Sequence, residues 1–420
     1  MSEKQIFAAL EIADHEVRLI VGEFFNTRFN IIKVERVPVT GLVFNEVTNP
    51  EAITEAIRRA VQQSAKMIGA DIRRVILAIP SYHLKRYSYS TSVNIEGIDG
   101  KVTVQDIRKA VRDAESVRVD KKYIVVQSVV NKYTVNGVSS RRRPIGEKAD
   151  QLTIDADILC ADRKMAFDLV TCVENAGLQI MDIFVDLYAV GKESALFEQA
   201  IDHQVIILKM EREMTALGLI RNGRLTTGTM LPSGIGTIAG AIMDKYGIKS
   251  DLAVELLKYS ARLNHTVLST NPVYIWAENG ETHTINEQEL VDCVRENINL
   301  WLNDLQKTCS PILQAGETTV MITGEGGETN GLDELVQDRL GVSVKKYIPD
   351  TLGGRNACLT SCLGLFYAYQ DKFPITEATQ SSLDLDEFIR HVSYRERSAD
   401  DSKEHTLTDK LKGLFKEGKK

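Results

Sequence analysis

The stretch FAALEIADHEVRLIVGEFFNTRFNIIKVERVP, residues 7–38, decides the fold, because its pattern returns as QVIILKMEREMTALGLIRNGRLTTGTMLP at residues 204–232. Each copy contains three apolar runs with the alternation of β-strands, separated by two short turns. The predicted strands are Phe7–Ile12, Val17–Glu23, Asn30–Val37, Val205–Lys209, Ala216–Arg221 and Leu225–Leu231. The repeat predicts two lobes, each beginning with a three-stranded antiparallel unit.

The composition agrees with two lobes and argues against several classes of partner. A chain of 420 residues is long for a single hydrophobic core. Its net charge of −7 argues against nucleic acid as a partner of the whole chain. Its six cysteines lack metal-binding spacing, so we expect neither a metal site nor a disulfide framework.

The chain after the first copy completes one lobe and adds an insertion to it. Apolar spacing predicts a helix at Pro50–Ile68 and a strand at Val75–Ile79. Residues 82–162 depart from the repeat and are predicted as an inserted α+β subdomain, whose helix begins after Thr103. The return to the first lobe is predicted through a helix, a strand and a helix, at Arg163–Gly177, Gln179–Asp186 and Leu187–Glu198.

The second lobe has a mostly helical insertion of its own. Asn286 with Glu289 three residues later is a capping-box signal for a long helix. The predicted elements of the insertion are Thr237–Tyr246, Ser250–Leu263, the hairpin Val273–Ile285 and Asn286–Leu305. A strand, a helix and a closing helix follow, at Thr319–Thr323, from Leu332 and at Leu359–Gln370.

These patterns set the expected domain boundaries. The first lobe comprises 1–81 and 163–198, with 82–162 inserted between them. The second lobe comprises 199–236 and 319–373, with 237–318 as its insertion. Residues 374–404 are polar and acidic, which predicts a flexible linker, and 405–420 change character again.

The last stretch, HTLTDKLKGLFKEGKK at 405–420, is predicted as an amphipathic membrane-binding helix. Four apolar side chains share one helical face, at Leu407, Leu411, Leu414 and Phe415. Lysines surround that face, at Lys410, Lys412, Lys416, Lys419 and Lys420. A disordered basic tail, or a helix that docks on protein, would also fit. One such helix binds an anionic membrane weakly, whereas an array of them on a polymer binds firmly through avidity.

The paired strand units resemble the two halves of an actin-type ATPase. In such proteins, turns from both halves grip the nucleotide, and the resemblance places these turns after Ile12, after Lys209 and after Thr323. The corresponding nucleotide positions are Ala13, Asp14, His15, Lys209, Glu211, Arg212, Glu213, Gly236, Lys258, Gly324, Glu325, Gly326 and Gly327. ATP and Mg²⁺ are therefore the ligands that the resemblance implies.

Two of these turns lack the residues that phosphate binding requires. A turn that closes its amides on phosphate needs glycines, yet Asp14 and the run from Glu211 to Glu213 stand there. Lys209 takes the position of an aspartate that orients magnesium-bound water. We predict a pseudo-ATPase with no catalytic residue and no metal site. Lys209 is then either a solvent-facing strand end or, with Arg212, the holder of an anionic ligand.

The whole chain further resembles FtsA, the actin-like bacterial cell-division family. The residues that carry this resemblance are Ala9–Ile12, Val17–Glu23, Ala114–Val119, Glu174–Leu178, Met321–Gly324 and Gly331-Leu332. Arg262 departs from the family pattern, which often has a glycine there. The resemblance implies an α/β actin-like (ASKHA) two-lobe fold, with an SHS2-like α+β subdomain in the first lobe and a helical/β insertion in the second.

The same resemblance implies a structural adaptor rather than an enzyme. Such a protein polymerises, binds the FtsZ C-terminal tail through 237–318, recruits later division proteins and lies on the cytoplasmic face of the membrane at the division site. Its partners would be FtsZ, other copies of itself, anionic lipids and division proteins, and not nucleic acid. A PilM-like scaffold of a pilus or secretion assembly is an alternative. A sugar or acetate kinase of the same superfold would need the carboxylate that Lys209 displaces.

Overall fold

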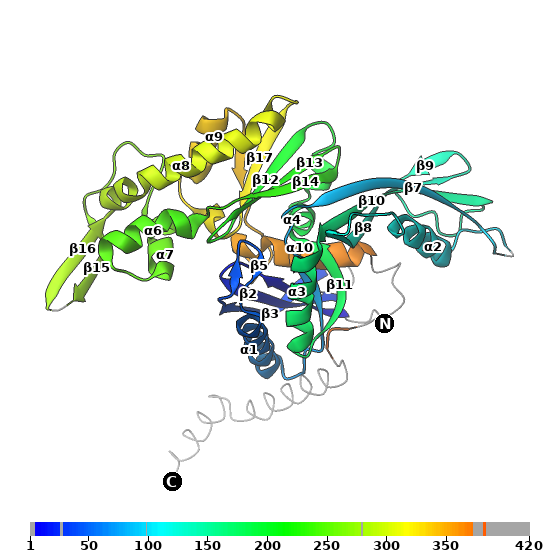
Figure 1. The fold of residues 1–420 in the computed structure, drawn as a ribbon, viewed down its shortest axis with the longest axis horizontal. Helices are drawn as coiled ribbons and strands as arrows, with labels where there is room; N and C mark the ends of the chain where they lie inside the picture. The colour runs from blue at the N-terminus through cyan, green and yellow to red at the C-terminus, as the bar shows by residue number, and fades with distance from the viewer. Residues whose placement is uncertain (1–4, 26–27, 98, 279, 373–380, 384–420) are drawn as a thin grey trace, which may run out of the picture.

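Two five-stranded sheets, one in each lobe, form the centre of the computed structural model (Figure 1). The structure describes residues 5–25, 28–97, 99–278, 280–372 and 381–383. The two lobes lie one above the other in Figure 1, with the inserted subdomain at one side and the second-lobe insertion at the other. This arrangement is the predicted actin-like two-lobe fold.

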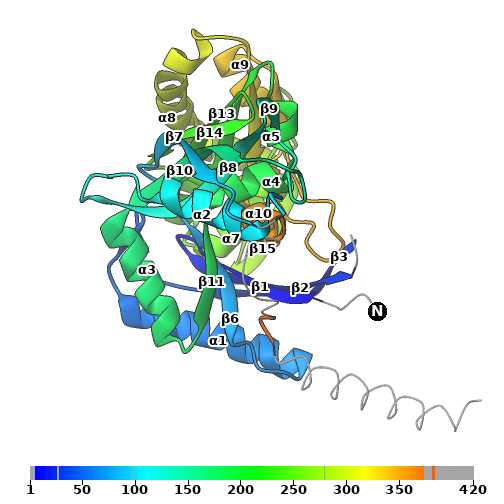
Figure 2. The same cartoon turned by 90° about the vertical axis from the view of Figure 1, so that its right-hand side faces the viewer.

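The first sheet has the strand order β11-β6-β1-β2-β3. Its strands are β1 (Gln5–Ile12), β2 (Glu16–Phe25), β3 (Arg28–Pro38), β6 (Arg74–Ile79) and β11 (Gln179–Val185). The first three pair in antiparallel fashion, as the repeat predicts, and β6 and β11 join in parallel. One face packs on α1 (Pro50–Ile68) and α3 (Arg163–Asn175), and in Figure 2 α1 lies below the sheet and α3 to its left.

The second sheet repeats this plan with the order β14-β13-β12-β17-β18. Its strands are β12 (Gln204–Met210), β13 (Thr215–Arg221), β14 (Arg224–Leu231), β17 (Thr318–Thr323) and β18 (Val344–Lys346). Two helices, α4 (Asp186–Glu193) and α10 (Thr360–Lys372), lie between the two sheets and share one apolar core with both of them. Cys358 and Cys362 are buried in this core.

The other face of the second sheet supports the helical insertion. The insertion contributes α6 (Ile235–Tyr246), α7 (Ser250–Ser260), α8 (Glu287–Leu313) and the hairpin of β15 (Pro272–Glu278) and β16 (Glu281–Asn286), and the lobe itself adds α9 (Leu332–Leu340). The predicted capping box of Asn286 and Glu289 is present. Helix α8 extends beyond the predicted Leu305, because Cys309 and Ile312 continue its apolar stripe.

The inserted subdomain of the first lobe is a four-stranded sheet with one helix and a core of its own. Its elements are β7 (Lys85–Asn94), α2 (Val104–Glu115), β8 (Tyr123–Val135), β9 (Val138–Ser140) and β10 (Gln151–Asp162). Thr103 caps α2 through a capping box with Asp106, so the predicted helix start is confirmed. The short β9 was not predicted, since its three residues are all exposed.

The helix predicted at Leu187–Glu198 is wrong as a single element. The chain forms α4 and then a short α5 (Leu196–Gln199), with Ala195 between them in the left-handed region at φ 52°. The break lets Phe197 fold back on α4, where its ring lies 4.8 Å from that of Tyr188. A Cβ at Gly191 would lie 2.8 Å from the same ring, so the close packing requires glycine.

Several short elements also escaped prediction. They are β4 (Leu42–Val43), β5 (Glu46–Val47) and the 3₁₀ turns η1 (Glu325–Glu328) and η2 (Ala357–Leu359). Pairs of two residues carry too little apolar periodicity to be recognised. In η1, the glycine-rich run forms a helical turn.

The linker predicted at 374–404 is wrong in part. Within it, Ser381–Leu383 pack against the first lobe, with Ser382 and Leu383 buried. The predicted amphipathic helix at 405–420, with its apolar and lysine positions, lies outside the described residues. Among the described residues, no helix has both the length and the apolar character needed to cross a membrane.

Candidate functional site

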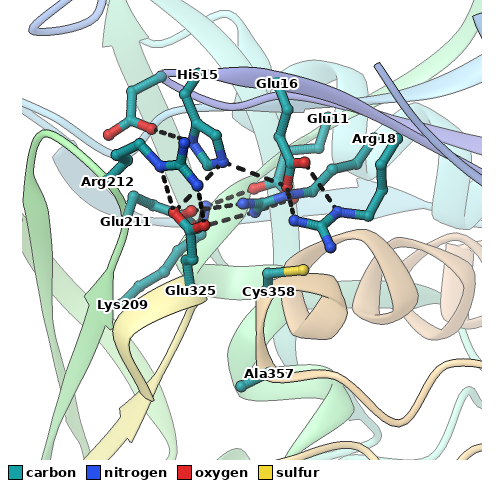
Figure 3. A network of polar contacts seen from close by, with 12 residues as sticks. Glu11, His15, Glu16, Arg18, Lys209, Glu211, Arg212, Glu325, Ala357 and Cys358 are labelled. Carbon is teal, nitrogen blue, oxygen red and sulfur yellow. Dashed lines mark hydrogen bonds and ion pairs between the residues drawn. The ribbon is translucent and has the colours of Figure 1, made fainter. Parts of the chain in front are cut away.

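Several of the predicted nucleotide positions, among them His15, Lys209, Glu211, Arg212 and Glu325, meet where the turns of both lobes face each other (Figure 3). The β1–β2 turn closes with a hydrogen bond from Ala13 N to Glu16 O at 2.9 Å, and the β12–β13 turn closes with one from Glu211 N to Met214 O at 2.8 Å. Both bonds span three residues, so the two copies keep the same turn. The repeat therefore retains its backbone geometry although its side chains have changed.

Lys209 lies at the centre of this junction and is only 5% exposed. Its Nζ donates to Glu11 Oε1 at 2.5 Å and to Asp186 Oδ2 at 3.0 Å, both in the first lobe. Burial by itself would lower the pKa of Lys209, but the nearby carboxylates of Asp186, Glu11 and Glu211 outweigh it and raise that pKa. The interpretation as a solvent-facing strand end is wrong.

Arg18 makes the reciprocal connection from the first lobe to the second. It is fully buried, and its Nη1 and Nη2 donate to the two carboxylate oxygens of Glu211 at 2.9 and 2.6 Å. Its Nε donates to Glu16 at 2.6 Å, and Nη1 also reaches Glu11 at 3.3 Å. Such a two-pronged pair fixes geometry as well as charge.

The sequence prediction missed Arg18, Glu11, Glu16 and Asp186. One signal was available, because the antiparallel register of the β1–β2 hairpin places Glu11 directly opposite Arg18. An arginine between Val17 and Leu19 in a buried strand also requires a partner. The pairing of Arg18 with Glu211 depends on how the two lobes meet, so local pattern could not supply it.

Arg212 fills the space in front of helix α6. Its Nε and Nη2 donate to Glu325 at 3.1 and 2.5 Å, and its Nη1 contacts Asp251. A Cβ at Gly236 would lie 2.4 Å from Arg212 Cγ, so this predicted position now accommodates the arginine stem. Neither Lys209 nor Arg212 is left without a carboxylate, so the prediction that they hold an external anion is not supported by their contacts.

The first amides of α6 are also occupied by the chain itself. Ile235 N donates to Glu211 O at 2.9 Å, and Gly236 N donates to Arg212 O at 2.7 Å. The amides at a helix start are the groups that usually bind phosphate. Here the β12–β13 turn supplies its own carbonyl oxygens to them.

Asp14 and His15 form the third connection between the lobes. Asp14 accepts from His15 Nδ1 at 2.8 Å and from Glu213 N at 2.7 Å, and His15 Nε2 lies 3.3 Å from Glu325 Oε2. Burial would raise the pKa of Asp14, but these donors outweigh it and lower the pKa. Asp14, His15 and Glu211 bring potential metal-ligand atoms within 4.8 Å of one another, yet Glu211 is already paired with Arg18.

The glycine-rich turn after β17 serves close packing of the backbone. Gly324 has φ 85°, and a Cβ there would lie 2.5 Å from Met210 O. Gly326 likewise leaves room for Met210 Sδ.

Two further positions singled out by the sequence are engaged in ion pairs. Lys258 is buried and pairs with Glu328 at 3.4 Å, and Arg262 pairs with Glu287 at 2.6 Å. A role of the glycine-rich turn in nucleotide binding stays a prediction.

The open space at the junction is small. The cavity lined by Glu11, Asp14, Ser81, Lys209 and Glu211 measures about 30 Å³. That volume is well below the roughly 300–1,000 Å³ of usual small-molecule sites.

The basic run Arg141–Arg143 lies away from this junction. Arg141 and Arg143 line a cleft of about 1320 Å³ between the inserted subdomain and the lobes, and Arg143 donates to the backbone carbonyl of Asp371. Arg142 is exposed. The loop therefore contacts the end of α10 and is not wholly solvated.

Comparison with known proteins finds similarity to FtsA proteins. Residues 81–160 match the family model described as the SHS2 domain inserted in FTSA. The cell division protein FtsA of Bacillus subtilis is 22% identical over 371 residues, covering 87% of this chain and 83% of that protein. FtsA of Neisseria meningitidis is 23% identical, covering 87% of this chain and 90% of that protein.

A solved structure gives the same result for the fold. In the PilM-PilN type IV pilus biogenesis complex, a chain that is 15% identical superposes with a TM-score of 0.57, covering 88% of this chain and 99% of that one. This likeness concerns the fold alone. The chain therefore resembles the FtsA cell-division proteins along most of its length, and its insertion at 81–160 matches the SHS2 domain of the FtsA type.

Proposed function

We propose that this chain is an actin-like cell-division adaptor whose lobes are joined by its own ion pairs instead of by a bound nucleotide. One observation carries the proposal: Lys209 and Arg18 are buried and cross between the lobes in opposite directions, each to a carboxylate of the other lobe. The two cations and their carboxylates occupy the junction that a nucleotide and its metal would need. In this proposal ATP hydrolysis is lost.

The physical character of the pairs supports a positioning role. Buried ion pairs contribute little net stability, but removing one partner costs about 3–5 kcal/mol, because the other charge stays buried. A cross-connected set of such pairs therefore strongly favours one relative placement of the lobes. That placement would persist whether or not ATP is present.

The adaptor part of the proposal rests on the relatives and on the sequence of the last segment. The chain would lie on the cytoplasmic face of the membrane at the division site, held by the apolar face that Leu411 and Phe415 share. The second-lobe insertion, which carries α6–α8 and the β15–β16 hairpin, would bind the FtsZ C-terminal tail. Self-association and contacts with later division proteins complete the proposed role.

Calorimetric titration with ATP and Mg²⁺ tests the nucleotide part. We expect no heat of binding from the intact chain. A matched variant carries Lys209→Asp with glycine at 211, 212 and 213, which restores the missing carboxylate and clears the turn. Binding of FtsZ tail peptide by both proteins would support a nucleotide-independent adaptor. Clear ATP binding by the intact chain, or peptide binding only by the variant, would overturn it.

Flotation with anionic liposomes tests the membrane part. Leu411→Glu with Phe415→Glu should leave the protein in solution, because two charges then enter the apolar face. The control Thr406→Glu with Gly413→Glu adds the same charge on the opposite helical face and should still float. Equal flotation of both variants would contradict membrane binding through this face.

A pilus or secretion scaffold is the second candidate, favoured by the likeness to the PilM chain. The sequence relatives favour division, since they cover most of both chains. Titration with FtsZ tail peptide distinguishes the two, because only the division adaptor should bind it.

A further inference from the structure

Ser382 is held in a slot at one end of the first sheet, far along the chain from the strands that form it. It is 0% exposed. Its backbone N donates to Ile6 O at 2.9 Å, its Oγ accepts from Ala8 N at 2.8 Å, and its carbonyl accepts from Arg73 N at 3.0 Å. One serine thus engages three backbone groups from two different segments of the lobe.

The residues on either side strengthen this contact. Leu383 is 5% exposed, forms an antiparallel bridge with Ile72 and joins the core between the first sheet and α1 and α3. Ser381 accepts from Arg74 Nη1 at 3.2 Å through its carbonyl and donates to Ile6 O at 3.2 Å through its hydroxyl. Backbone pairing and apolar burial therefore act on the same three residues.

The slot exists because β1 and β6 pair over only part of their length. Their parallel register joins Ala9 with Ile76 and Leu10 with Leu77. Before this point the strands separate, and the amides of Ala8 and Arg73 face the gap between them. Buried backbone groups need partners, and Ser381–Leu383 supplies them from the far end of the chain.

We propose that Ser381–Leu383 forms a clasp, which fixes the point where the C-terminal segment leaves the first lobe and so favours one side of the protein for facing the lipid. This rests on the proposed membrane function. From Leu383, the 21 residues 384–404 span at most about 75 Å before His405. From Lys372, the last residue of α10, the 32 residues 373–404 would span at most about 115 Å.

The corner at the clasp suits an anionic lipid surface. Ile72 follows the last turn of α1 closely, and that turn carries Lys66, exposed, and Met67, which is 61% exposed. A basic side chain beside an exposed apolar one is the combination that interfacial contacts use. The clasp would bring this corner, rather than the second-lobe insertion, toward the bilayer.

Hydrogen exchange in the absence of lipid tests the clasp itself. In Leu383→Asp, we expect the amides of Ala8 and Arg73 to exchange at least about tenfold faster than in the intact chain, because the buried leucine no longer holds Ser382 in place. Leu411→Glu, which alters only the tail, should leave both amides unchanged. Unchanged exchange in Leu383→Asp would overturn the clasp.

A chain that ends at Gln380 is a second test, because Leu383→Asp could disturb folding more widely. Its Ala8 and Arg73 amides should exchange quickly, and an added peptide that spans 377–390 should slow them again. Failure of the peptide to restore protection in a folded truncated chain would also overturn the clasp.

Lipid quenching tests the orientation. A fluorophore is placed at Met67→Cys or, for comparison, at Val267→Cys in the second-lobe insertion, where the side chain is 81% exposed, both with Cys293→Ser. On anionic vesicles with quencher-bearing lipids, we expect stronger quenching at 67 than at 267, and a smaller difference in Leu383→Asp. Equal quenching at both positions in a protein that floats would overturn the orientation. Absence of flotation would overturn the membrane function, while exchange still reports on the clasp.

Discussion

The β12–β13 turn and the glycine-rich turn after β17 lie at the same junction, but only the second contains the glycines that the actin-type resemblance expects. In the first, Glu211, Arg212 and Glu213 stand where the actin-type resemblance expects glycine, and their groups reach the other lobe or the start of α6. In the second, Gly324 and Gly326 remain, because Met210 lies against them. Glycine stands where the chain approaches itself, and larger residues stand where the resemblance places a ligand.

Under the proposed function, ion pairs within the chain stand in for contacts to a bound nucleotide. Phosphates and a divalent cation would bring both signs of charge to such a junction. Here carboxylates of Glu11, Glu211 and Glu325 supply the negative charge, and Lys209, Arg18 and Arg212 supply the positive charge. Side chains of the protein therefore provide both the positive and the negative charges at this junction.

Among changes to the ion pairs at the β12–β13 turn, we expect Lys209→Met to have the largest effect. It leaves Glu11 and Asp186 without the ammonium that both contact, while adding no volume. We expect a loss of about 3–5 kcal/mol in the free energy of unfolding, measured with urea. The double variant Lys209→Met with Glu11→Gln should lose less than the sum of the single changes. Strict additivity would mean that the two side chains do not interact.

Acid should weaken the same network through Glu16. Burial would raise the pKa of Glu16, but Arg18, Arg36 and His15 outweigh it and lower the pKa to about 2 from an ordinary value of 4.5. Because the folded value is the lower one, the stabilisation is present above pH 4.5 and is lost as pH falls toward 2. The difference corresponds to about 3 kcal/mol. Glu16→Gln should flatten the stability profile over this window, and an unchanged profile would contradict the assignment.

Gly324→Ala tests whether the turn after β17 requires glycine. Its φ of 85° with ψ of −175° is open to glycine alone, and the new Cβ would press on Met210 O. We expect a loss of about 2–3 kcal/mol, read from urea denaturation. Gly240→Ala is the matched control, since it lies in α6 with no atom within 4 Å of the added Cβ. That change should be neutral or stabilising, and an equal loss in both variants would contradict a local cause.

The smallest effects should come from the rim of the network. Arg212→Ala removes the paired contact with Glu325, and we expect a loss of about 1.5–3 kcal/mol. Asp251→Asn touches the same arginine from an exposed position, so its effect should stay below about 1 kcal/mol. The stabilities of the two variants are compared by thermal unfolding. A larger loss of stability in Asp251→Asn than in Arg212→Ala would contradict the view that Glu325 is the more important partner of Arg212.

The sequence was sufficient to predict the helices and strands that depend on local apolar periodicity and capping residues. The strand repeat, α1 at Pro50–Ile68 and the starts of α2 and α8 are confirmed, because apolar spacing and capping residues act within a few positions of each other. The site was predictable only as a set of positions. Its contacts were not, because Lys209 and Glu11 lie 198 residues apart and meet only when the lobes close. The clasp escaped prediction for the same reason, since its three residues sit in a polar stretch.

The ion pairs between the lobes have one further consequence for any polymer of this chain. In a polymer whose subunits hydrolyse a nucleotide, older subunits differ chemically from newer ones, and the difference sets when they leave. Here every subunit would keep the same internal contacts for as long as it stays assembled. Buried pairs such as Arg18 with Glu211 are also poorly screened by salt. Turnover would then be governed from outside the subunit, by protein concentration, lipid and bound partners.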